Sequence, residues 1–135
     1  MAIDMGVKGI LFVAHIGKFV KVAAGIMNTH SHNADGRMEV LAANGIRAGS
    51  DLECARKILE CNTTDEALQI LEQNGILKPA MEQVMKRIQF YLNHRSYDQI
   101  LLGAVVFSNV YGYLGMTEDA PCLIQKIQKE YKGEL

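Results

Sequence analysis

Two nearly unbroken runs of apolar residues stand out along the chain. The first, Gly9 to Ala14, reads GILFVA, and the second, Gln99 to Phe107, reads QILLGAVVF. Neither run shows the alternation of apolar and polar residues that marks a strand exposed on one face. Such runs are typical of parallel strands that helices cover on both faces. The two runs therefore predict a buried parallel pair of strands.

Most of the remaining chain carries apolar residues at helical spacing, and this pattern predicts six helices. Capping residues, glycine stops and prolines mark their ends. The first helical pattern follows Gly17. For the others the signals are Asp35 and Gly49, Ser50 and Glu53, Thr63 and Glu66 with Gly75, Pro79, and Asp119 with Pro121. The fifth and longest helix should bury a stripe made of Met81, Val84, Met85, Ile88 and Leu92.

Together these elements predict an α/β fold with a small, mostly parallel sheet and a helix-rich layer. Tyr111 to Gly115 can be read as a turn or as a short edge strand, and Ala2 to Gly6 as the last turn of a helix. Two core strands are few for six amphipathic helices, since sheets usually have about five strands. We therefore expect residues 1–135 to form a single domain that is a fragment of a larger α/β domain. A truncated sheet should expose an edge and promote self-association.

Composition and charge exclude several classes of protein. Fourteen basic against fifteen acidic residues give a net charge of −1, which argues against a general binder of nucleic acid or membrane surfaces. No apolar run approaches the roughly 18 residues of a membrane span. The three cysteines, Cys54, Cys61 and Cys122, fit no disulfide framework and suggest packing residues in a reducing compartment. We expect a cytoplasmic protein.

Candidate chemistry concentrates between His15 and Glu39, which hold three of the four histidines. At its start, a strand passes into a helix, where Gly17 and Lys18 would suit an anion, although an ordinary strand-to-helix turn also explains them. Further on, Asn28 to Asp35 consists almost entirely of residues with hydrogen-bonding side chains, as a solvated loop would. His30 and His32 lack a third ligand at a recognisable spacing, so no metal site is predicted.

The stretch HIGKFVKVAAGIMNTHSHNADGRMEVLAA closely resembles the conserved block of the CbiD family, the cobalt-precorrin-5B C1-methyltransferases of anaerobic vitamin B12 synthesis. Two positions depart from the family pattern: Ala14 stands where glycine is common, and His32 where arginine is frequent. Family members are more than twice as long and carry this block in their second half. The chain therefore resembles the C-terminal portion of such an enzyme.

The resemblance implies S-adenosylmethionine as methyl donor and a cobalt corrinoid as acceptor. It implies catalytic roles for His15, His30 and Asp35, with a histidine removing a proton as the ring is alkylated. The residues expected to bind the substrate or the methyl donor are Gly17, Lys18, Lys21, Asn28, Thr29, Ser31, Arg37 and Glu39. The cationic members would contact the carboxylates at the corrinoid periphery, and all these residues are expected to form one concave anion receptor.

Two other interpretations remain open. The same basic segment would allow a non-catalytic module that binds a tetrapyrrole or another anion. A purely structural domain would instead use its polar loop to contact a partner chain or a missing N-terminal domain. Titration with the donor and with a corrinoid separates these possibilities from the enzyme, because only the enzyme should bind the donor.

Overall fold

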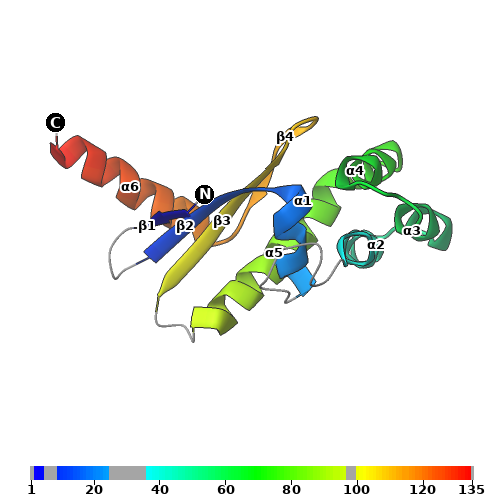
Figure 1. Cartoon of the computed structure of the whole chain (residues 1–135), viewed down its shortest axis with the longest axis horizontal. Helices are drawn as coiled ribbons and strands as arrows, with labels where there is room; N and C mark the ends of the chain where they lie inside the picture. Colours follow the sequence, from blue (N-terminus) through cyan, green and yellow to red (C-terminus); the bar gives the residue numbers. More distant parts are fainter. Residues whose placement is uncertain (1, 5–8, 25–35, 97–99, 135) are drawn as a thin grey trace.

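The computed structural model describes residues 2–4, 9–24, 36–96 and 100–134, and within them four strands form one sheet (Figure 1). The strands are β1 (Ala2–Asp4), β2 (Gly9–His15), β3 (Leu101–Ser108) and β4 (Gly112–Met116), in the spatial order β1-β2-β3-β4. The central strands β2 and β3 are parallel, as predicted, and both outer pairs are antiparallel. The α/β class is confirmed, and the sheet is mixed.

The two outer strands differ from the central pair in how well the sequence predicted them. The β1 segment was predicted as the end of a helix, and the β4 segment as either a turn or an edge strand. Ala2 to Asp4 form a strand and not the end of a helix, with Ala2 paired to Phe12 and Asp4 to Ile10. The outer edge of β2 would otherwise leave its backbone N–H and C=O groups without sheet partners. The edge-strand reading of Tyr111 to Gly115 is confirmed by β4, whose register against β3 shifts between Val106 and Phe107.

The helices follow the predicted order, with shifted starts. They are α1 (Ile16–Phe19), the 3₁₀ helix η2 (Val20–Ala24), α2 (Arg37–Arg47), α3 (Leu52–Leu59), α4 (Thr64–Gln73), α5 (Leu77–Ser96) and α6 (Ala120–Glu134). None of the helices among the described residues has both the length and the apolar character needed to cross a membrane.

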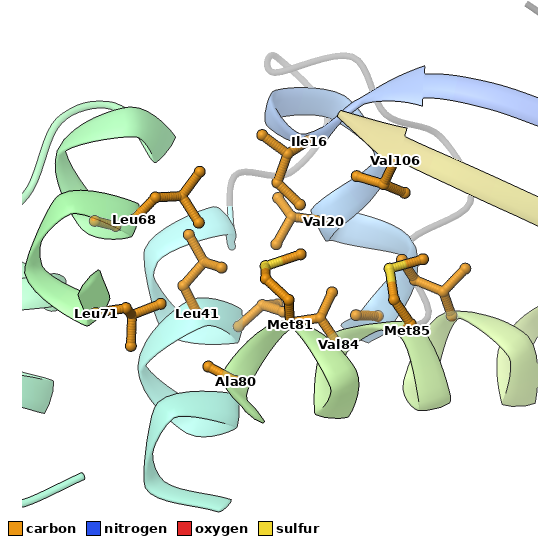
Figure 2. Close-up of a cluster of buried hydrophobic side chains, with 14 of the residues drawn as sticks. Ile16, Val20, Leu41, Leu68, Leu71, Ala80, Met81, Val84, Met85 and Val106 are labelled. Carbon is orange, nitrogen blue, oxygen red and sulfur yellow. The ribbon is translucent and has the colours of Figure 1, made fainter. Parts of the chain in front are cut away.

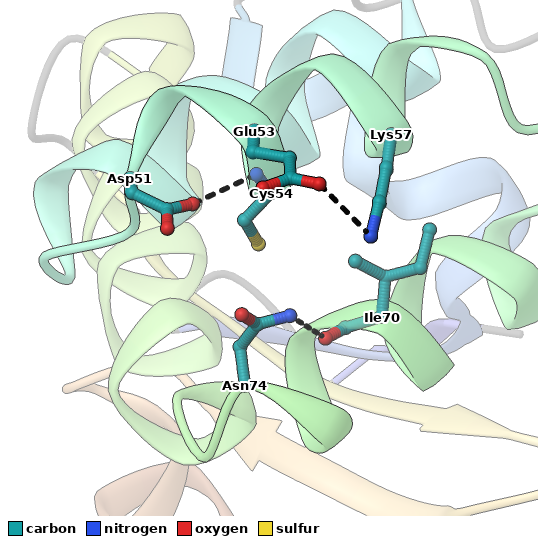
Figure 3. A network of polar contacts seen from close by, with 6 residues as sticks. All are labelled: Asp51, Glu53, Cys54, Lys57, Ile70 and Asn74. Atoms are coloured by element: carbon teal, nitrogen blue, oxygen red, sulfur yellow. Dashed lines mark hydrogen bonds and ion pairs between the residues drawn. The ribbon is translucent and has the colours of Figure 1, made fainter.

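The predicted N-cap of α4 is confirmed, although the Glu66 carboxylate accepts from the Asn62 amide and not from that of Thr63, and the predicted N-cap of α3 is wrong by one residue. Thr63 Oγ1 accepts a hydrogen bond from the Glu66 amide at 3.2 Å, as expected. At α3, Asp51 and not Ser50 accepts from the Cys54 amide, at 2.8 Å (Figure 3). Asp51 has the extended backbone that an N-cap requires, with φ −82° and ψ 174°.

The ends of α2 agree only in part with the predicted signals. Its N-cap is Gly36, which has no side chain to accept a hydrogen bond, so the cap lies one residue after the predicted Asp35. Asp35 itself lies outside the described residues. The glycine stops after α2 and α4 are confirmed, because Gly49 and Gly75 have φ values of 102° and 73°, a region that favours glycine.

Helices cover both faces of the sheet, because successive strand side chains point to opposite faces. On one face, α5, η2 and α2 bury the main core, in which the predicted α5 stripe is wholly buried. Figure 2 shows Met81, Val84 and Met85 of this stripe. On the other face, α6 buries Leu123 against Leu11. The helix approaches closely there, since a Cβ on Gly103 would lie 3.0 Å from the backbone of Ala120.

Candidate functional site

His15 is the last residue of β2 and caps α1. Its Nδ1 accepts a hydrogen bond from the Gly17 amide at 2.9 Å, and its ring meets the Phe107 ring edge-on, with centroids 5.7 Å apart. A neutral imidazole that accepts at Nδ1 carries its proton on Nε2. Helix capping therefore occupies one nitrogen of His15, and Nε2 is the nitrogen available to a ligand.

Gly17 and Lys18 lie beside His15 at the carboxyl end of β2. A Cβ on Gly17 would lie 3.1 Å from His15 Nδ1 and 3.6 Å from Thr64 Oγ1 of α4, so glycine permits a close approach there. The Lys18 side chain is exposed. Because α1 has only four residues, its end contributes little of the dipole expected at a helix N-terminus. Any attraction of this turn for anions comes mainly from the Lys18 charge.

Lys21 does not share this surface. Its side chain is only 1% exposed, and it lies in η2, which packs against α5 and α2. It takes part in a contact inside the protein. A ligand at the surface could reach the Lys21 ammonium group only if η2 moved, whereas Lys18 is accessible as the chain stands.

The remaining described site residues belong to α2. Arg37 is half-buried, and Glu39 is exposed and lines a groove of about 290 Å³ between η2, α2 and α5. The residues lining this groove, which we call the arginine groove, are Ala23, Gly36, Glu39, Val40, Ala43, Asn44, Arg47, Arg87 and Tyr91. Ala23 and Gly36 flank the segment 25–35 on its two sides.

Five predicted site residues lie outside the described residues: Asn28, Thr29, His30, Ser31 and Asp35. Their roles, and that of His32, stay predictions, as does the single anion receptor. The described members fall in two places, with His15, Gly17 and Lys18 at the turn after β2 and Glu39 in the arginine groove. Among residues 2–4, 9–24, 36–96 and 100–134, no three His, Cys, Asp or Glu side chains gather as metal ligands would.

The sequence reasoning missed the two arginines of the groove. Arg87 Nη2 donates a hydrogen bond to Tyr91 Oη at 3.0 Å, and its Cζ lies 4.8 Å from the centroid of the Phe90 ring. Arg47 Nη1 donates to Asn44 Oδ1 at 3.0 Å. Both pairs have helical spacing that the sequence shows. Nothing in the sequence indicates that α2 and α5 would bring the two arginines to one groove.

Tyr111 forms a further polar contact, at the turn between β3 and β4. Burial raises the pKa of its hydroxyl, and the Glu72 carboxylate, which accepts a hydrogen bond from it, and Asp65 raise that pKa further. The hydrogen bond to Glu72 links this turn to α4.

A larger groove, of about 810 Å³, lies between α5 and β4. Phe90 and Tyr113, both largely exposed, line it together with Met85 and the charged Lys78 and Lys86. None of the site residues predicted from the sequence lines it. Its volume falls within the range of pockets that hold small organic ligands.

Comparison with known proteins identifies related sequences. A family model described as "CbiD, C-terminal domain" matches residues 28–118. Proteins named cobalt-precorrin-5B C(1)-methyltransferase are similar: that of Ruminiclostridium cellulolyticum is 38% identical over 109 residues, covering 81% of this chain and 28% of the relative.

The relative from Clostridioides difficile is 38% identical over 124 residues, covering 90% of this chain and 30% of its own length. That of Methanocaldococcus jannaschii is 44% identical over 92 residues, covering 68% and 25%. The chain thus spans less than a third of the length of these relatives. No solved structure matches.

Proposed function

The chain belongs to the CbiD family, whose C-terminal domain matches residues 28–118, and we propose that it acts as the C-terminal part of a cobalt-precorrin-5B C1-methyltransferase. The donor of the methyl group would be S-adenosylmethionine, and the reaction would be a step of anaerobic cobalamin biosynthesis in the cytoplasm. The observation that carries this proposal is the family match, together with relatives that all bear this enzyme's name.

For methyl transfer, the main task of the protein is to position the donor and the acceptor. In methyl transfer the acceptor carbon attacks the methyl group in line with the bond that breaks, so the protein must hold the two reacting centres about 3 Å apart. The groove between α5 and β4, about 810 Å³ in volume, has room for a molecule of the donor's size. The exposed Lys18 and the half-buried Arg37 carry charges suited to carboxylates on the acceptor.

We propose that a histidine removes the proton from the alkylated ring. In neutral His15, Nδ1 is occupied by the Gly17 amide and Nε2 carries the proton, so His15 would have to release its cap to act as a base. His30, the other histidine that the resemblance implies, would then be the base, with Asp35 orienting it. Asn28, Thr29 and Ser31 would supply hydrogen bonds to the ligand, and Glu39 would accept one.

The first test is calorimetric titration of the chain with S-adenosylmethionine and, separately, with a corrinoid. Binding of the donor supports the enzyme. Binding of the corrinoid alone favours the non-catalytic tetrapyrrole-binding module, and binding of neither favours an interaction domain.

The second test measures methyl transfer in a chimera in which this chain replaces the matching segment of the Ruminiclostridium cellulolyticum relative. Lys18→Ala and His30→Ala should each lower kcat/KM at least tenfold, because a lost charge contact or base costs about 1.4 kcal/mol or more. The control is Lys57→Ala on α3, whose exposed ammonium lies 3.5 Å from Glu53 (Figure 3). Unchanged kinetics for both variants would remove Lys18 and His30 from the site.

A further inference from the structure

We propose that Arg87 and Arg47 make the arginine groove a binding site for a carboxylate arm of the ligand. The identity of that ligand, an acidic corrinoid, rests on the proposed function. The carboxylate site itself rests on the geometry of the two guanidinium groups, neither of which the family resemblance singled out.

Arg87 is held in place by uncharged partners. Its Cζ lies 4.8 Å from the ring centroid of Phe90 and 5.1 Å from that of Tyr91, and the two rings meet at 85°. Tyr91 Oη accepts from Nη2 at 3.0 Å, and Nε is buried with no acceptor among the described residues. Aromatic rings and a phenol fix the guanidinium without neutralising its charge.

Arg47 is fixed in a similar way. Asn44 is 1% exposed, donates from Nδ2 to the Val40 carbonyl at 2.9 Å, and accepts from Arg47 Nη1 at 3.0 Å. The amide is therefore anchored to its own helix and in turn orients Arg47. Within the part of the chain that the structure describes, neither arginine has a carboxylate close enough for an ion pair.

The charge and size of the groove select the ligand group. Among the described residues that line it, two arginines outweigh one glutamate, Glu39. Guanidinium groups bind carboxylates through short charge-assisted hydrogen bonds. The volume of about 290 Å³ is too small for a tetrapyrrole ring and sufficient for a short acidic arm. We therefore assign to the groove an acetate- or propionate-type arm of the corrinoid periphery, with the ring outside it.

The test compares two corrinoids that share a ring and differ in charge: cobyrinic acid, with free carboxylates, and its heptamethyl ester. Calorimetry on this chain should show that the acid binds at least tenfold more tightly than the ester. Arg87→Gln and Arg47→Gln should each weaken binding of the acid at least tenfold, because each removes a charge-assisted contact, and should leave ester binding unchanged.

Two further variants separate the site from general effects. Arg56→Gln removes an exposed arginine of α3 that does not line the groove, and it should bind the acid as the unmodified chain does. Tyr91→Phe keeps the Arg87 charge and removes only the phenol that orients it, so acid binding should weaken by a few-fold. Circular dichroism and thermal melting show whether each variant is folded; Arg87→Met, which also removes the charge, replaces Arg87→Gln if the latter unfolds.

Three results would overturn the proposal: equal binding of acid and ester, unchanged acid binding in both folded arginine variants, or an equal loss with Arg56→Gln. Failure of the proposed function gives a different pattern. In that case the chimera does not methylate its substrate, while acid binding by this chain still depends on Arg87. Conversely, a chimera that methylates normally with Arg87→Gln refutes the carboxylate site and leaves the methyltransferase assignment intact.

Discussion

At the scale of single residues, the two lysines that follow β2 have opposite environments. Lys18 is exposed, and Lys21 is 1% exposed in the core between η2, α2 and α5. Burying an ammonium group is costly unless it is paired, and Lys21 does engage in a contact within the protein. The family resemblance implies that both residues are ligand-binding cations, whereas the structure gives one of them a role in stability.

This difference predicts the outcome of paired substitutions. Lys21→Ala should lower the free energy of unfolding by about 2 kcal/mol or more, because it leaves a cavity in the core and removes the contact that the Lys21 side chain makes. Lys18→Ala should change that free energy by less than about 0.5 kcal/mol. Chemical denaturation followed by circular dichroism measures both. Equal stability of the two variants would show that the Lys21 side chain is not needed in the core.

At the scale of secondary-structure elements, local hydrogen bonds set where each helix begins. The carboxylate of Asp51 takes the N-cap position of α3 that the sequence assigned to Ser50, and the Ser50 hydroxyl is left buried without a partner among the described residues. The capping box was misplaced because Ser50 and Asp51 are both good capping residues. Which one caps depends on where the chain leaves the turn at Gly49.

The two residues should therefore respond differently to alanine. Asp51→Ala should destabilise the protein by about 1 kcal/mol, since the Cys54 amide loses its acceptor. Ser50→Ala should be neutral or slightly stabilising, because it removes a buried hydroxyl that makes no hydrogen bond. Urea denaturation midpoints measure the difference. A larger loss with Ser50→Ala would restore the capping box predicted from the sequence.

At the scale of the whole molecule, the sheet ends on one side at β4, a short strand whose outer edge has no strand beside it among the described residues. Next to it, Phe90 and Tyr113 are 54% and 60% exposed and line the groove of about 810 Å³. Exposed strand edges beside apolar surface promote pairing between chains. The self-association expected from the sequence thus has a specific place in the fold.

We predict that the isolated chain dimerises in a concentration-dependent way through this surface. Sedimentation velocity should show a larger average mass as the concentration rises, and Tyr113→Lys should shift the equilibrium toward monomer by placing a charge on the edge strand. Leu52→Lys, at another exposed apolar position on α3, is the matched control and should have no effect. A monomer at all concentrations would contradict the prediction.

The sequence by itself determined the two central strands and the order of the helices, because hydrophobic period, capping residues and glycine stops act over a few neighbouring positions. The parallel strand pair, the buried stripe of α5 and the ends of α2 and α4 at glycine all follow from such local signals. The β1 strand did not, since three residues become a strand only when β2 offers an edge to pair with.

Only the tertiary structure decided which polar side chains share a surface. It buried Lys21, used one nitrogen of His15 for a cap, and set Arg47 of α2 beside Arg87 of α5 in one groove. The physical reason is that helix packing fixes such neighbours through contacts between residues far apart in sequence. No local pattern along the chain specifies those contacts.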